Sequence, residues 1–139
     1  MGMNDDIPAG FEPETDDGRF FDMIGPVYAR RDTPEAAPIF AFRAGRKHTN
    51  QRDVVQGGML VTLGDHTLAI ACWTAAQGPC ATISLNTDFL GPAREGDWVE
   101  ARGEVTKMTR SLVFGKSYVY ANGNLILTAT GVWKRLGKD

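Results

Sequence analysis

Residues 54–87 contain one charged side chain, Asp65, and this stretch limits the possible folds more than any other part of the chain. Its first part, QGGMLVTLGDHTLAIACWTAAQG, has no proline and is long enough for a helix of about five turns. Apolar residues occupy most of the circumference of that helix, which predicts a buried helix rather than a surface one. Other elements of the chain must therefore wrap around it.

The sequence on both sides of this helix predicts strands. Residues 19–31 hold a short apolar segment and then an extended one, and 37–44, 81–90, 98–108, 111–121 and 125–136 have strand patterns. Asn122-Gly123 joins the last two and is typical of a type I′ hairpin. The order predicts an α+β fold, in which a long curved antiparallel β-sheet wraps around one central helix.

Length and charge narrow the class of protein. The chain has 139 residues, a length that predicts a single domain, placed over residues 19–139. Residues 1–18 are acidic and contain Pro and Gly, and they are expected to form a flexible leader. A net charge of −2 does not suggest a nucleic-acid partner, and the glycines and Asp65 within the apolar stretch argue against a membrane span. The N-terminus lacks the pattern of a secretory signal. Together with Cys72 and Cys80, interpreted as reduced core thiols, this predicts a cytoplasmic protein.

Two motifs carry a resemblance to a known family. HTNQRDVVQGGMLVTLGDHT and ISLNTDFLGPAREGD, with the element order above, resemble the hotdog-fold acyl-CoA thioesterases of the PaaI-like branch, over about Phe20 to Leu136. That branch typically has an Asn a few residues before His-Gly-Gly, and an Asp eight or nine residues further on. Asn50, Gly57, Gly58 and Asp65 match this pattern in order and spacing. The resemblance implies the hotdog fold and hydrolysis of an acyl-CoA thioester.

Gln56 stands where the branch has its histidine. A glutamine keeps an amide N–H donor but does not titrate near pH 7. It can therefore hydrogen-bond a carbonyl oxygen, but it cannot transfer a proton as an imidazole does. The consequence for substrate or rate is left open by the sequence.

The spacing of Gly57 and Asp65 favours a dimer. On one helix the two residues lie roughly 12 Å apart along the axis, too far to meet at one carbonyl group. Two antiparallel helices related by a two-fold axis can bring Asp65 of one chain beside Gly57 of the other. The resemblance implies the same homodimer or a dimer of dimers, and the sequence does not choose between them.

Each candidate catalytic residue has a predicted role in that composite site. The free N–H of Gly57, at the positive end of the helix, can donate to the developing oxyanion, and Asn50 or Gln56 can supply a second donor. Asp65 would attack the thioester or activate a water as general base, and desolvation would raise its pKa. Thr82, on the face of its strand opposite Ile83, would orient that water.

The substrate contacts are predicted from the same resemblance. Gly58 belongs to the helix start, and Arg110 and Ser111 lie in a turn similar to the family's entry to the fifth strand, where CoA phosphates are expected, with assistance from Lys107, Lys116 and Lys134. No metal or redox cofactor is expected, because His, Cys and carboxylates do not cluster with ligand spacing. CoA enters as part of the substrate, and the acyl group stays open between aromatic and medium-chain acids.

Structural roles compete with these assignments. Asp65 can be a buried acid bonded to a backbone N–H or to His66, Asn50 can form an Asx-turn, and the two glycines can serve close packing. His48 is interpreted as a loop residue and His66 as a helix neighbour of Asp65, since no Ser or Cys nucleophile stands in a recognisable motif with either. The main alternative function is a non-catalytic hotdog domain that binds acyl-CoA as a sensor or carrier. A dehydratase or hydratase is less favoured, because it usually needs a His paired with a carboxylate on the helix, and no His stands at that position.

Overall fold

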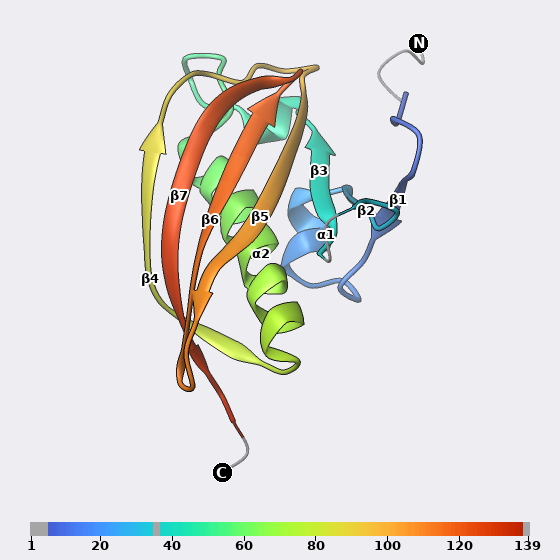
Figure 1. Ribbon diagram of the computed structural model, residues 1–139. Helices are drawn as coiled ribbons and strands as arrows, with labels where there is room; N and C mark the ends of the chain where they lie inside the picture. Colours follow the sequence, from blue (N-terminus) through green and yellow to red (C-terminus); the bar gives the residue numbers. More distant parts are fainter. Residues whose placement is uncertain (1–5, 35–36, 138–139) are drawn as a thin grey trace.

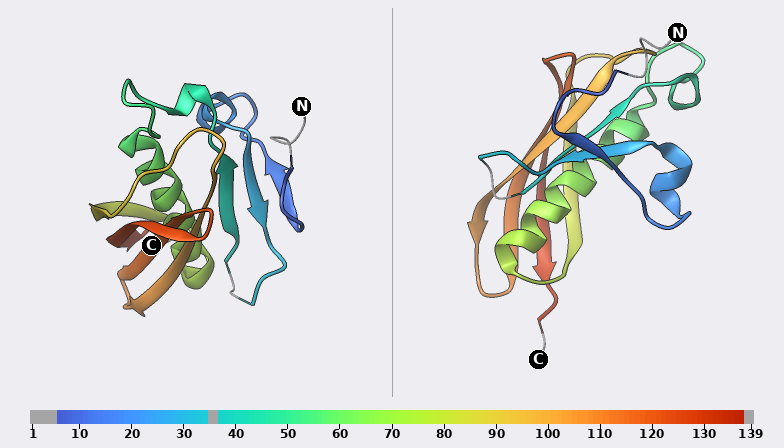
Figure 2. Two further views of the ribbon diagram at one scale, coloured as in Figure 1. Left: turned by 90° about the horizontal axis from the view of Figure 1, so that it is seen from above. Right: turned by 90° about the vertical axis from the view of Figure 1, so that its right-hand side faces the viewer.

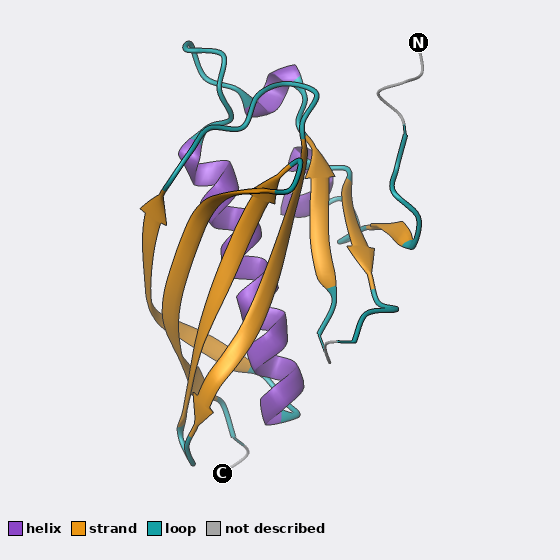
Figure 3. Cartoon of the chain, turned by 45° about the horizontal axis from the view of Figure 1, so that its top comes forward, coloured by secondary structure: helices purple, strands orange, loops and turns teal. Residues whose placement is uncertain are grey.

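The computed structural model describes residues 6–34 and 37–137, and within them the chain forms one sheet around one long helix (Figure 1). The strands run antiparallel in the order β1-β2-β3-β5-β6-β7-β4. Their bounds are β1 (Phe11–Glu14), β2 (Val27–Arg30), β3 (Ile39–Arg43), β4 (Cys80–Phe89), β5 (Trp98–Met108), β6 (Leu112–Ala121) and β7 (Asn124–Arg135), with helices α1 (Phe20–Ile24), η2 (Arg46–His48) and α2 (Gly57–Ala76). Helix α2 lies along the concave side of the curved sheet (Figures 2 and 3). The predicted hotdog fold is confirmed.

Helix α2 is buried on one side, not around its whole circumference as the sequence predicts. Its buried residues come in neighbouring pairs four apart, so they form one stripe: Met59, Leu60, Leu63, Gly64, Thr67, Leu68, Ala71 and Cys72. Trp73, on the other side, is 44% exposed. The helix passes as a membrane span by length and composition alone, but here it is the core helix of the sheet. No element of the described chain packs over the opposite, apolar side of this helix.

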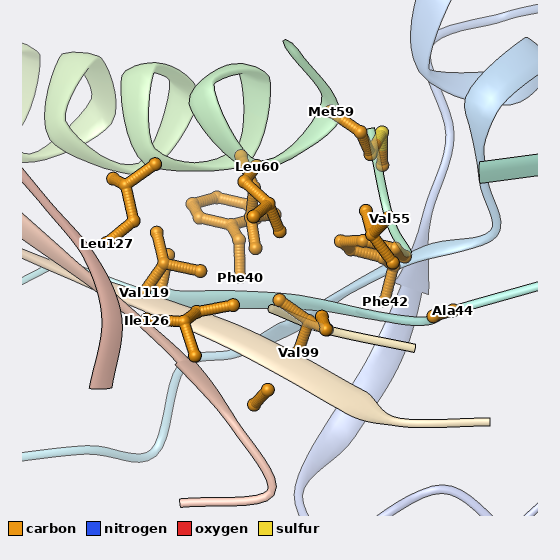
Figure 4. Close-up of a cluster of buried hydrophobic side chains, with 14 of the residues drawn as sticks. Phe40, Phe42, Ala44, Val55, Met59, Leu60, Val99, Val119, Ile126 and Leu127 are labelled. Carbon is orange, nitrogen blue, oxygen red and sulfur yellow. The ribbon is translucent and has the colours of Figure 1, made fainter. Parts of the chain in front are cut away.

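The main core lies between α2 and the strands β3, β5, β6 and β7. Figure 4 shows Leu60 of the helix pointing toward Phe40, Val119 and Leu127, which come from three different strands. All three strand side chains are at most 2% exposed. Replacing a buried phenylalanine such as Phe40 by alanine in a core of this kind lowers the free energy of unfolding by about 3–5 kcal/mol. The packing therefore fixes the helix, and with it the residues that the helix carries, relative to the sheet.

Close approach of helix and sheet depends on a glycine of β5. A Cβ at Gly103 would lie 3.1 Å from the Thr67 carbonyl oxygen and 3.2 Å from the Leu68 Cα. Both neighbours are atoms of the helix backbone, which cannot move aside as a flexible side chain can. Any larger residue at Gly103 would push the middle of α2 away from the strands.

Strand β4 lies at one edge of the sheet and contains a bulge that changes its predicted faces. Thr82 pairs with Trp133 and Ser84 with the next residue, Val132, so Ile83 is the extra residue of the bulge. Directly opposed residues share a face of the sheet, and Trp133 is fully buried on the helix side. Thr82 therefore lies on the helix side. Strict alternation along residues 81–90, on which Thr82 is placed opposite Ile83, would put Thr82 and Leu85 on opposite faces. This prediction is wrong at the bulge.

The N-terminal part differs from the prediction in one respect. Phe11–Glu14, expected to belong to a flexible leader over residues 1–18, form β1 and pair with β2; residues 1–5 lie outside the described part. Elsewhere the predicted strands agree with the observed ones to within one or two residues at each end. Asn122 and Gly123 have φ of 49° and 87°, as a type I′ hairpin requires.

Candidate active site

The start of helix α2 presents unused backbone donors. Met59 and Leu60 donate their N–H groups to the Gln56 carbonyl, at 2.9 Å and 3.4 Å. Within the described residues nothing accepts from the N–H groups of Gly57 and Gly58. Gln56 is the N-cap residue, yet its side chain does not cap the helix. Free N–H groups at the positive end of a helix dipole suit a carbonyl oxygen that gains negative charge.

The segment before the helix is fixed by His48, which is buried. Its Nδ1 accepts from the Gly45 N–H at 2.9 Å, and its Nε2 lies against the Ile24 carbonyl, to which an Nε2–H would donate. Burial lowers the pKa of His48, with an opposing effect of the Ile24 bond and a further lowering by Lys47. The His48 carbonyl accepts from the Gln56 N–H at 2.8 Å. His48 is thus a structural residue that holds the start of α2 in place.

Asn50 and Gln56 contact each other through their side-chain amides. Asn50 Nδ2 donates to Gln56 Oε1 at 3.3 Å, while Asn50 Oδ1 accepts from the Arg52 N–H at 2.8 Å. The bond from the Arg52 N–H forms an Asx-turn, the structural role considered for Asn50 from the sequence. Asn50 therefore has this role and contacts Gln56 at the same time. A cavity of about 420 Å³ adjoins this loop and is lined by Arg46, Thr49, Asn50, Gln51 and Asp53.

Asp65 lies two turns further along the helix, on its open side. Its Oδ1 is buried and makes no hydrogen bond within the described chain. Desolvation raises the pKa of this carboxyl. The imidazole of His66 is held elsewhere, edge-on to Phe21 and Phe40 with ring centroids 4.3 Å and 4.5 Å apart. Asp65 therefore lacks the backbone or His66 partner that a purely structural acid would need.

Phe89, at the end of β4, packs on the first residue of the helix. A Cβ at Gly57 would lie 3.0 Å from Phe89 Cε1, although the Phe89 side chain is 56% exposed. Phe89 is not one of the candidate site residues predicted from the sequence. The order of the elements could have indicated Phe89. Strand β4 follows α2 closely in sequence and runs back along it, so the end of β4 lies near the start of the helix (Figure 1).

Thr82 lies at the opposite end of β4, beside the second half of the helix. The neighbouring Cys80 carbonyl accepts from the Trp73 indole N–H at 3.0 Å, which places this end of β4 near the helix C-terminus. The bulge turns Thr82 toward the helix side. Among the described residues, Thr82 and Asp65 are not joined by a hydrogen bond.

Arg110 and Ser111 lie far from Gly57 within one chain. Both are exposed in the β5–β6 turn, at the end of the sheet opposite the start of α2 (Figure 1). Lys107, Lys116 and Lys134 are exposed as well. One chain thus brings together Asn50, Gln56, Gly57 and Gly58, and leaves Asp65, Thr82 and the basic turn apart. Across the described residues, His, Cys, Asp and Glu form no group of three able to hold a metal ion.

Comparison with known proteins gives the family. The Thioesterase superfamily profile matches residues 53–125. PA0474, a candidate esterase of Pseudomonas aeruginosa, is 33% identical over 129 residues, which cover 91% of this chain and 96% of that protein. Human acyl-coenzyme A thioesterase 13 is 30% identical over 84 residues, 57% of this chain and 59% of the human protein. The match therefore spans somewhat more than half of that relative.

Solved structures agree with this assignment. A point mutant of the phenylacetic acid degradation protein PaaI from Thermus thermophilus superposes with a TM-score of 0.76, at 26% identity, over 84% of this chain and 98% of the other. Zebrafish thioesterase superfamily member 2 also gives 0.76, at 25% identity, over 88% and 89%. The chain belongs to the Thioesterase superfamily, as a hotdog-fold member of the PaaI-like kind. It is an enzyme of thioester hydrolysis.

Proposed function

We propose that the protein hydrolyses acyl-CoA thioesters at two equivalent sites, each formed by Asp65 of one chain and the α2 start of another. Names of the relatives, acyl-coenzyme A thioesterase 13 among them, support acyl-CoA as the substrate class. The CoA phosphates are expected to reach the exposed turn that contains the basic Arg110 and the hydroxyl of Ser111. The acyl group is not specified by these contacts.

One observation carries this proposal: Asp65 Oδ1 is buried without a partner in the described chain. Leaving a buried acceptor unsatisfied costs about 1–3 kcal/mol, and more for a charged group. Such a group persists where it has a task that needs a desolvated, basic carboxylate. The raised pKa of Asp65 has that desolvation as its cause.

The chemistry follows from the groups at the site. The thioester carbonyl oxygen accepts from the Gly57 N–H, and a side-chain amide of Asn50 or Gln56 supplies a second donor. Asp65 takes a proton from a water that Thr82 orients, the water oxygen bonds to the carbonyl carbon, and the carbon–sulfur bond breaks. The proton then passes to the departing thiolate, which leaves free acid and thiol. In the alternative mechanism, with Asp65 as nucleophile, its carboxylate oxygen bonds to the carbonyl carbon, the carbon–sulfur bond breaks and the thiolate leaves. Water then hydrolyses the resulting acyl anhydride, which restores the carboxylate, releases the free acid and supplies the proton that the thiolate takes up.

A second copy of the chain completes the site in this proposal. The open side of α2 exposes Trp73, and β4 leaves a free edge next to it that exposes Ile83. Pairing of two β4 edges across a two-fold axis would cover these side chains. The solved thioesterase HI0827, described as hexameric, is an oligomeric structural neighbour. A dimer is the minimum that the site requires.

The same proposal includes no metal or redox cofactor, since proton transfer and two donors suffice for the steps above. It also places the protein in the cytoplasm. The free, buried thiols Cys72 and Cys80 suit a reducing compartment, and burial raises the pKa of both, that of Cys72 to about 12.

The competing function is a non-catalytic domain that binds acyl-CoA. Thiol release from a panel of aromatic and aliphatic acyl-CoAs, followed with a thiol-reactive dye, separates the two. Wild type should turn over, and Asp65→Asn should lower kcat by at least about 10²-fold with the same fold and oligomeric state. Glu95→Gln, which changes an exposed carboxylate between β4 and β5, serves as the control and should stay near wild type. Binding without thiol release by the wild type would favour the competing function.

A further inference from the structure

We infer that Asn50 acts on the thioester through Gln56: Gln56 Nε2 is the second oxyanion donor, and Asn50 is a positioning residue that turns that amide the right way. The inference rests on the proposed function and decides between the two donors that it leaves open. It concerns the residue at which this chain departs from the family pattern.

The orientation of Asn50 is set by the backbone. Its Oδ1 accepts from the Arg52 N–H at 2.8 Å, so this end of the amide must be the oxygen. Its Nδ2 then faces Gln56 and donates to Gln56 Oε1 at 3.3 Å. The loop that holds Asn50 is closed by backbone bonds as well, from the Asn50 N–H to the Val54 carbonyl at 2.9 Å and from the Asp53 N–H to the Asn50 carbonyl at 3.0 Å.

The orientation of Gln56 follows from Asn50. With Oε1 occupied, Gln56 presents its Nε2–H group, for which the described part of the chain contains no acceptor. Its backbone is fixed independently by the bond from its N–H to the His48 carbonyl. The free side-chain donor thus belongs to the residue directly before Gly57, whose N–H is the first predicted donor.

A glutamine at this position requires such a partner. Its amide carries an oxygen and an NH₂ group at the same end of the side chain, and a simple rotation exchanges them. The wrong orientation would present a carbonyl oxygen to a developing oxyanion and repel it. The N–H of Asn50 removes that ambiguity by holding the oxygen of Gln56.

Asn50→Asp tests this inference with a minimal change. Aspartate keeps the acceptor for the Arg52 N–H but offers Gln56 an oxygen in place of an N–H. Gln56 should then rotate, donate to the new carboxylate and point its own oxygen at the thioester. We expect kcat to fall by about 10²-fold, the scale for loss of one oxyanion donor, with KM changed by less than about threefold. Gln51→Glu places the same charge on the exposed neighbouring residue and should leave kcat near wild type.

A double-mutant cycle separates action through Gln56 from direct contact. Gln56→Ala alone should lower kcat by about 10²-fold, and adding Asn50→Asp to it should cost less than about threefold more. If Asn50 itself touched the thioester, the two losses would multiply to about 10⁴-fold, which would overturn the inference. Urea unfolding of each variant monitors the fold, which a purely structural role of Asn50 would destabilise equally in both backgrounds.

A measurement without turnover distinguishes this inference from the proposed function. An acyl-CoA analogue with a CH₂ group between carbonyl and sulfur cannot be hydrolysed. In NMR spectra of ¹⁵N-labelled protein, it should shift the Gln56 side-chain amide signals, assigned with Gln56→Ala, and this shift should disappear in Asn50→Asp. Such shifts in a protein that releases no thiol would support the inference while the proposed hydrolysis fails. Shifts of the Asn50 amide alone, unaffected by Gln56→Ala, would contradict it.

Discussion

The ring of Phe89 lies on the first residue of helix α2, so close that a Cβ at Gly57 would be 3.0 Å from Phe89 Cε1. The ring covers the helix start on one side and is itself 56% exposed, so it can yield to a small side chain at Gly57. This tolerance allows Gly57 to be replaced by Pro or by Ala, and only the first of these removes the backbone N–H.

Gly57→Pro should remove the proposed oxyanion donor, the Gly57 N–H, and keep the helix. Proline is favoured at the first helical residue, where the N–H has no helical partner, and the preceding Gln56, at φ −58° and ψ 133°, already has a conformation that proline accepts. We expect kcat to fall by about 10²–10³-fold. Gly57→Ala, which retains the N–H and displaces the same ring, should lower kcat by less than about tenfold. Equal losses in both variants would mean that crowding by Phe89, and not the donor, matters.

Mixed dimers should restore activity from two inactive chains. A chain with Asp65→Asn still provides a normal helix start, and a chain with Gly57→Pro still provides Asp65. Because each proposed site takes one group from each chain, a mixed dimer contains one intact site. Random assortment should give about a quarter of the wild-type activity per chain. Co-expression with two affinity tags allows the mixed dimer to be purified and assayed. Absence of recovery would place both groups of a site in one chain.

Asp65→Asn should stabilise the protein at neutral pH. The pKa of Asp65 is raised in the folded state by desolvation, so folding disfavours its charged form. The resulting destabilisation is absent below the unfolded pKa of 3.8 and complete above the raised folded pKa. We expect the free energy of unfolding at pH 7 to increase by about 1 kcal/mol in the variant, the lower end of the penalty for an unsatisfied buried group. Urea unfolding at equal chain concentration measures it, and the difference should shrink toward pH 4.

Acid should weaken the contact between α2 and the N-terminal segment through His66. Burial between Phe21 and Phe40 lowers the pKa of His66 from 6.5 to about 4, against smaller raising effects of Glu14 and Asp16. The folded state thus favours neutral His66, whose contribution is complete above pH 6.5 and is lost as the pH falls toward 4. A shift of that size corresponds to about 3 kcal/mol.

His66→Phe provides the test of that acid sensitivity. It keeps an aromatic ring against both neighbours and removes the titrating group. The free energy of unfolding, followed from pH 7 to pH 4, should decline less in the variant than in wild type, by about 3 kcal/mol at the acid end. His48 remains in both proteins and contributes its own decline, since its pKa is lowered as well. Parallel curves for the two proteins would show that His66 does not carry the acid sensitivity.

A curved antiparallel sheet around one helix was predictable from sequence because its signals are local, and the motifs that resemble the family added the hotdog fold. A long proline-free apolar stretch gives α2, and Asn122-Gly123 gives the last hairpin, with no need for tertiary information. The bulge at Ile83 was not predictable, since a strand that slips by one residue keeps the same apolar and polar letters. The one-sided burial of α2 was missed for a different reason: an apolar helix surface does not say whether its own sheet or another chain covers it.

The candidate site was predictable in its residue types but not in its contacts. Spacing along the helix alone separates Asp65 from Gly57 by roughly 12 Å. The amide pair of Asn50 and Gln56 depends on how the loop between them closes, and its hydrogen-bond direction depends on the Arg52 N–H. Phe89 approaches Gly57 only after β4 has turned back along the helix. These are tertiary relationships, which a motif does not encode.

The free edge of β4 has a consequence for partner choice among related proteins. Backbone N–H and C=O groups are the same in every strand, so this edge by itself would accept the corresponding edge of any chain with a matching twist. In the proposed dimer, discrimination between a second copy of this chain and a related protein would come from side chains beside the edge. Trp73 and Ile83 are 44% and 57% exposed beside this edge. Their shapes would fit a second copy of this chain better than a related chain with other side chains there. In a cell that contains several hotdog proteins, the shapes of these two side chains would disfavour mixed dimers.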